Sequence, residues 1–130
     1  MFAHLQIAED RAGNVVIVRL TGQLVAEEDA LGFRNFVDAL IQSGARRLVV
    51  NLRELSYIDS CGVGSLVAKF VTIKQLGGHL KLACPNSRVL RILTITGLLA
   101  VFEIFDSEEA AVRSFAAPSP APADRQPLAG

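Results

Sequence analysis

The pattern of apolar and polar positions along the chain predicts five strands. A period of two, or a continuous β-branched run, is typical of a strand. The predicted strands cover residues 2–7, 14–20, 47–52, 79–84 and 101–105. Turn-rich residues 9–14 join the first two into a hairpin, and the nearly unbroken apolar run of residues 47–52 predicts burial on both faces.

Apolar residues at helical spacing predict four helices between and after these strands. The positions that mark them are Ala30, Phe33, Phe36, Val37, Leu40 and Ile41; Val63, Leu66, Val67, Phe70, Val71 and Lys74; Val89, Leu90 and Leu93; and Ala111, Val112 and Phe115. Gly44 and Gly77 end the first two helices, whereas residues 85–87 and 106–107 supply N-caps for the last two.

The order of these elements predicts an α/β fold with a small, mixed, mostly parallel sheet. Strands that are joined through a helix pair in parallel by right-handed crossovers. The chain of 130 residues is long enough for one domain and too short for two. We place that domain at residues 1–115. Residues 116–130 hold four of the five prolines and little that a core could bury, so we expect a flexible tail rich in Pro and Ala.

The charge balance argues against nucleic acid and membranes as partners. Thirteen Lys and Arg offset thirteen Asp and Glu, so there is no basic excess to attract phosphates or anionic lipids. The chain shows neither a signal-peptide pattern nor an apolar run of about 18 residues. Cys61 and Cys84 match no redox or zinc motif, and His4 and His79 have no metal-binding partners at suitable spacing. We expect a soluble cytoplasmic protein with no metal and no cofactor.

Candidate chemistry concentrates at residues 59–62, between the third strand and the second helix. Ligands of open α/β sheets bind where strands lead into helices, and a helix N-terminus favours negative charge. Ser60 could therefore carry a phosphate, but an Asp-Ser pair before a helix is also a common N-cap that needs no function. A phosphatase loop with Cys61 as its nucleophile requires an arginine at position 67, where this chain has Val67. A phosphate-binding loop requires a lysine after Gly62-Val63-Gly64, where this chain has Ser65. The sequence therefore disfavours both kinds of site.

Residues 52–64, which read LRELSYIDSCGVG, closely resemble the signature of STAS domains, and specifically of the bacterial anti-sigma factor antagonists. Residues 19–24, 73–78 and 96–98 resemble further parts of the same family in the same order. The resemblance covers about residues 4–115 and implies the STAS fold.

The resemblance implies a non-enzymatic partner switch with Ser60 as its phosphoacceptor. In the family, an anti-sigma factor that is also a histidine-kinase-like ATPase phosphorylates this serine. The unphosphorylated antagonist binds that anti-sigma factor, the phosphorylated one is released, and a serine phosphatase of the PP2C type resets the switch. The partner-binding surface is then expected to comprise Thr21, Gly22, Gln23, Leu24, Val25, Asp59, Ser60, Cys61, Gly62, Val63, Gly64 and Leu66.

Two positions depart from the family's pattern and keep alternatives open. Val25 stands where the family often has Asp, and Cys61 stands where it often has Ser. The alternatives are a non-switching scaffold of the stressosome kind, the STAS partner of an ABC-transporter ATPase, and an enzyme that uses the Cys61 thiol. Val63 and Leu66 are expected at the interface if exposed, and in the core otherwise.

Overall fold

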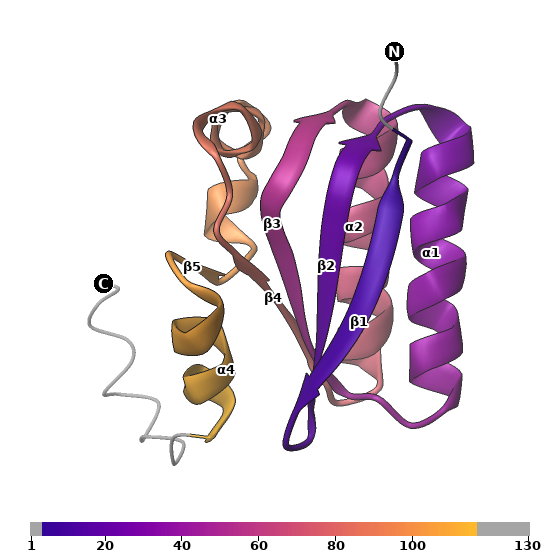
Figure 1. Cartoon of the computed structure of the whole chain (residues 1–130), viewed down its shortest axis with the longest axis vertical. Coiled ribbons are helices and arrows are strands. Elements are labelled where there is room, and N and C mark those ends of the chain that lie inside the picture. Colours follow the sequence, from indigo (N-terminus) through magenta and orange to yellow (C-terminus); the bar gives the residue numbers. More distant parts are fainter. Residues whose placement is uncertain (1–3, 117–130) are drawn as a thin grey trace.

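A computed structural model of the protein describes residues 4–116, in which the elements follow the predicted order (Figure 1). They are β1 (Gln6–Ala12), β2 (Val15–Leu24), α1 (Ala26–Gln42), β3 (Arg47–Ile58), α2 (Ser60–Gln75), β4 (His79–Ala83), α3 (Ser87–Ile95), the 3₁₀ turn η1 (Leu98–Ala100), β5 (Ile104–Phe105) and α4 (Glu108–Ala116). Of the predicted tail, only Ala116 lies within the described residues.

The five strands form one sheet in the order β1-β2-β3-β4-β5. β1 pairs with β2 in antiparallel fashion, and all the other neighbours are parallel. This arrangement confirms the predicted mixed, mostly parallel α/β sheet. Because β2 and β3 are parallel, their carboxyl ends meet at the same edge, which lies at the top of Figure 1.

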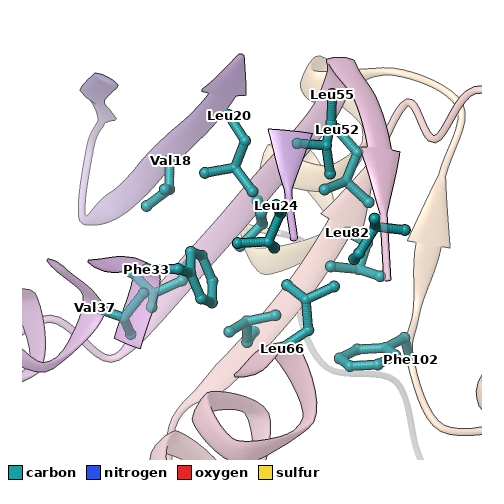
Figure 2. Close-up of a cluster of buried hydrophobic side chains, with 14 of the residues drawn as sticks. Val18, Leu20, Leu24, Phe33, Val37, Leu52, Leu55, Leu66, Leu82 and Phe102 are labelled. Atoms are coloured by element: carbon teal, nitrogen blue, oxygen red, sulfur yellow. The ribbon is translucent and has the colours of Figure 1, made fainter. Parts of the chain in front are cut away.

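The helices cover both faces of this sheet. Figure 1 shows α1 and α2 together on one side and α4 on the other. The larger core lies under α1 and α2, where Leu24 of β2, Phe33 of α1 and Leu66 of α2 point into one cluster (Figure 2). A smaller cluster between the sheet and α4 includes Val49 and Ala111. The carboxyl edge of the sheet is therefore the place where α2 begins over a packed core.

β2 and β3 both run further than predicted. β2 continues to Leu24 and β3 to Ile58, although their apolar runs end near Leu20 and Leu52. The register shifts twice between the two strands, after Arg19 and after Gly22, and each shift gives β3 one extra residue. From Leu52 to Ile58, every third residue of β3 is therefore buried. This spacing matches neither a regular strand nor a helix.

Smaller corrections concern β1, β5 and the buried face of α2. The first strand is predicted too early: β1 begins at Gln6, residues 4 and 5 precede it, and residues 9–12 of the predicted turn belong to it. β5 is only two residues long. The expected stripe of α2 is wrong in its second half, because Val71 is exposed while Ile73 is fully buried. Lys69 is also buried there, and its Nζ lies 2.6 Å from Oδ1 of Asp38 on α1. A pattern of apolar residues cannot predict this buried position, because a lysine is buried only when a partner such as a carboxylate compensates its charge.

The predicted N-caps of α3 and α4 are confirmed. The Asn86 side chain accepts a hydrogen bond from the backbone N–H of Val89 at 2.9 Å. Ser107 Oγ accepts one from the backbone N–H of Ala110 at 3.0 Å. Both caps are short-range contacts, which is why turn residues before a helical pattern predict them well.

Candidate functional site

The connection between β3 and α2 consists of one residue, Asp59, and this residue caps the helix. Its Oδ1 accepts a hydrogen bond from the backbone N–H of Gly62 at 3.0 Å. Ser60 is therefore not the N-cap but the first helical residue, and its side chain is exposed. Because Asp59 already caps the helix, the Ser60 hydroxyl is not needed for that role.

Asp59 also joins the start of α2 to the end of β2 and the start of α1. Its Oδ2 accepts a hydrogen bond from the backbone N–H of Ala26 at 2.8 Å, and its own N–H donates to the Leu24 carbonyl at 3.3 Å. Ala26 has a φ of 63°, a left-handed conformation that costs a non-glycine residue about 1–2 kcal/mol. The Asp59 carboxylate thus stabilises a strained turn as well as a helix end.

Gly62 allows α2 to start close to the end of β2. A Cβ on Gly62 would lie 2.3 Å from the Leu24 carbonyl oxygen and 2.7 Å from a side-chain carbon of Ile58. Gly64, two residues further along α2, has no atom within 4 Å of such a Cβ. Of the two glycines in the motif, only Gly62 is required for close packing.

The structure brings the two predicted recognition segments together, but it exposes only part of them. Thr21, Ser60 and Gly64 are exposed, and Gln23, Val25, Asp59 and Cys61 are half-buried. Gly22, Leu24, Gly62, Val63 and Leu66 are buried. Of the two alternatives for Val63 and Leu66, the structure decides for the core, because both side chains pack in the larger cluster; their inclusion in the exposed partner-binding surface is therefore wrong. The expected loop at residues 21–25 is mostly strand, since β2 ends at Leu24.

The electrostatics of this site are set by backbone groups. The Asp59 carboxylate accepts two backbone N–H donors, and no Lys or Arg of residues 4–116 forms a salt bridge with it. Ser60 lies in the first turn of α2, where backbone N–H groups have no partner inside the helix and the helix dipole is positive. The site can accept a negatively charged group on Ser60, but it already holds one carboxylate charge.

A second polar cluster, on the α4 face, was not predicted from the sequence. The Arg19 guanidinium donates to both Glu108 carboxylate oxygens, at 2.9 and 2.8 Å, and Asn51 Nδ2 donates to one of them at 2.8 Å. The hydrogen bonds from Arg19 lower the pKa of Glu108 below its usual value. These residues come from β2, β3 and α4, so no local motif links them.

The thiols and histidines do not form a metal centre. Cys84 is buried and Cys61 is half-buried; both are free thiols. Within residues 4–116, no three His, Cys, Asp or Glu side chains come together in a way that could hold a metal ion. None of the described helices is both long enough and apolar enough to span a membrane.

Comparison with known proteins gives consistent matches. The STAS domain family model matches residues 6–111. The anti-sigma F factor antagonist of Paenibacillus polymyxa is 30% identical over 105 residues, which cover 81% of this chain and 90% of that protein. The anti-sigma-B factor antagonist of Bacillus subtilis is 38% identical over 74 residues, covering 57% and 67% of the two chains.

Solved structures share the same fold. The anti-sigma factor antagonist SpoIIAA in its unphosphorylated form has a TM-score of 0.74 at 23% identity, covering 88% of this chain and 100% of that one. The Bacillus cell fate determinant SpoIIAA in its phosphorylated form has a TM-score of 0.66 at 22% identity, with coverage of 85% and 98%. The chain therefore belongs to the STAS domain family, in the group of the anti-sigma factor antagonists.

Proposed function

We propose that the protein is a partner switch that binds an anti-sigma factor while Ser60 is unphosphorylated and leaves it after phosphorylation. The observation that carries this proposal is the position of Ser60 at the start of α2. It is exposed, it lies beside a helix N-terminus, and Asp59 rather than Ser60 caps the helix. A kinase can therefore modify the hydroxyl without breaking a contact that the fold needs.

The phosphate would act through charge. The γ-phosphoryl group of ATP passes to Ser60 Oγ, which leaves ADP and releases the hydroxyl proton. The product adds about −1.5 to −2 charge at pH 7 beside the Asp59 carboxylate. The helix dipole makes this charge tolerable in water, but a close-fitting partner would have to desolvate it. Release then needs no refolding of the domain.

The proposed contact surface is the exposed part of the two segments that Asp59 joins. Its reachable members are Thr21, Gln23, Val25, Asp59, Ser60, Cys61 and Gly64. The buried members of the predicted set support this surface by packing beneath it; they are Gly22, Leu24, Gly62, Val63 and Leu66. The proposed partners are an anti-sigma factor with ATP-dependent serine kinase activity and a PP2C-type phosphatase, in the cytoplasm, and the protein itself performs no catalysis. The existence of SpoIIAA in an unphosphorylated and a phosphorylated form supports this assignment.

Phosphorylation of the purified chain tests the proposal. Each anti-sigma factor kinase of the source organism is incubated with the chain and ATP, and mass spectrometry locates the phosphate. We expect a single phosphate on Ser60 and none on the Ser60→Ala variant. Ser65→Ala is the matched control, because Ser65 lies on the same helix but is buried and donates to the Gly62 carbonyl.

Binding measurements complete the test. We expect Ser60→Asp to weaken binding to the same kinase at least tenfold, about 1.4 kcal/mol. Labelling at another residue, or no labelling by any kinase, contradicts the proposal. Equal binding by Ser60→Asp and the wild type would indicate the non-switching scaffold or transporter-partner role, which the Val25 departure favours.

A further inference from the structure

Charge is segregated along this chain although its net charge is zero. Residues 60–102 contain three Lys and two Arg but no Asp or Glu. Two of these lysines are neutralised by partners elsewhere in the fold, Lys69 by Asp38 and Lys81 by Glu103. Arg88 and Arg91 of α3 form no salt bridge within the described residues 4–116. The remaining cation, Lys74 of α2, is exposed and forms no salt bridge among these residues either, so α3 displays two of the three unpaired charges of this stretch.

The solvent side of α3 combines this charge with apolar surface. Val89 and Leu93 pack into the core, and Arg88, Arg91 and Ile95 lie on the other side of the helix at intervals of three and four residues. Arg88 and Arg91 are exposed, and Ile95 is the most exposed large hydrophobic side chain of the described residues, at 69%. We call Arg88, Arg91 and Ile95 the α3 face.

The α3 face adjoins the segment that leads into the phosphorylation site. Arg88 Nη1 donates to the Ser56 carbonyl at 3.2 Å, and Asn86 Nδ2 donates to the Leu55 carbonyl at 2.6 Å. From Ser56, β3 continues only to Ile58 before Asp59 and Ser60. Figure 1 shows α3 at the same end of the sheet as the start of α2. The α3 face and Ser60 thus lie at one edge of the domain.

We propose that the α3 face is a second docking surface, and that it binds an acidic, partly apolar surface of the same anti-sigma factor. This inference rests on the proposed function, because it assumes that protein as the partner. Two arginines with no acidic neighbour on their helix call for carboxylates opposite them, and exposed Ile95, about one turn beyond Arg91, calls for an apolar contact beside those carboxylates. A DNA or membrane partner is disfavoured by the zero net charge of the chain, which offers no overall basic excess to attract phosphates or anionic lipids.

The two surfaces would act together. Carboxylates that are attracted by Arg88 and Arg91 would be repelled by a phosphate on Ser60 at the same edge. Because the α3 face binds a partner with a negatively charged surface, a single phosphate on Ser60 would be enough to repel that partner. Binding through this face should weaken as salt rises, because exposed charges are screened.

Binding of the purified anti-sigma factor kinase to charge-reversal variants tests the proposal. We expect Arg91→Glu to weaken binding at least tenfold and to reduce its salt dependence. Arg113→Glu is the matched control, since Arg113 is an exposed arginine on α4, and it should change the affinity less than twofold. An equal effect of both variants, or no effect of Arg91→Glu, overturns the proposal.

A zero-length cross-link tests the chemistry of the opposing surface. Arg91→Lys keeps the charge and provides an amine that carbodiimide can couple to a carboxylate. We expect a covalent product with the kinase that maps to an Asp or Glu, and no product with Arg113→Lys. Coupling by both variants or by neither contradicts the docking surface.

The two proposals can fail separately. If Arg91→Glu loses binding but Ser60→Asp does not, the α3 face stands and the phosphate switch falls. If Ser60→Asp loses binding but Arg91→Glu does not, the switch stands and the α3 face falls. If none of the purified kinases binds the wild-type chain, both are wrong.

Discussion

The N-termini of α2 and α4 are each anchored on the sheet by a carboxylate, but the two carboxylates are satisfied in different ways. Asp59 at α2 accepts hydrogen bonds from two backbone amides, of Gly62 and Ala26. Glu108 at α4 accepts them from the guanidinium of Arg19 and the amide of Asn51. The first site keeps an unpaired negative charge among the described residues, whereas the second is an ion pair.

This difference separates a site suited to signalling from one suited to stability. At α4, Arg19 already forms a salt bridge with Glu108, so the charge of this carboxylate is neutralised. At α2, backbone dipoles alone hold the acid, and the neighbouring Ser60 hydroxyl is exposed. A phosphate on Ser60 would make the local charge more negative, from −1 to about −2.5 to −3. No arginine of residues 4–116 forms a salt bridge with Asp59 that could neutralise part of this charge. We infer that a phosphate on Ser60 at the α2 end affects partner binding with little effect on folding, whereas loss of the Arg19–Glu108 ion pair at the α4 end affects folding.

The close approach of α2 to β2 gives the largest expected effect. Gly62→Ala should lower the free energy of unfolding by about 3 kcal/mol or more, because the new methyl group meets a backbone oxygen that cannot move freely. Gly64→Ala is the matched control on the same helix. It meets no atom and should stabilise the protein by about 0.5–1 kcal/mol through helix propensity. Urea denaturation measures both, and equal effects would contradict the packing argument.

The double role of Asp59 predicts the next largest effect. Asp59→Ala removes the acceptor for the N–H groups of Gly62 and Ala26, so we expect a loss of about 2 kcal/mol. Ser60→Ala should change stability by less than about 0.5 kcal/mol, since its exposed side chain is not the cap. Thermal and urea unfolding of the two variants measure the contrast. A loss in Ser60→Ala as large as that in Asp59→Ala would mean that the serine is structural.

The ion pair at α4 predicts that folding stability depends on pH. Arg19 lowers the pKa of Glu108 in the folded state. The ionised carboxylate therefore stabilises the fold fully above its usual pKa of about 4.3, and this contribution is lost as the pH falls through the lowered pKa. Between about pH 5 and about pH 3, the wild type should lose more stability than Glu108→Gln.

Urea midpoints across this pH range measure the effect. Glu109→Gln is the control, because the neighbouring Glu109 is exposed and lies outside the hydrogen-bonded cluster. We expect Glu109→Gln to follow the wild-type profile. Parallel profiles for the wild type and Glu108→Gln would show that the pair with Arg19 contributes nothing to folding.

The order and type of the elements could be predicted from the sequence because their signals are local. Periodicity and turn residues predict the five strands and four helices of residues 4–116 in their order, although the first strand is placed too early, and the predicted cap segments 85–87 and 106–107 contain the caps Asn86 and Ser107. The ends of β2 and β3 were missed, since the burial of Leu55 and Ile58 follows from two shifts of register between strands. A register shift is a relation between two segments, so neither segment displays it alone.

The candidate site divides in the same way. The sequence determined the motif around Ser60, its place before a helix and its family resemblance, because those features lie within a few consecutive residues. Only the tertiary structure decided that Leu66 is core and that Asp59 holds Ala26, 33 residues away. It alone placed Glu108 on Arg19, 89 residues away. Hydrogen bonds and burial depend on distance in space, and the folded chain sets those distances by packing its elements against one another.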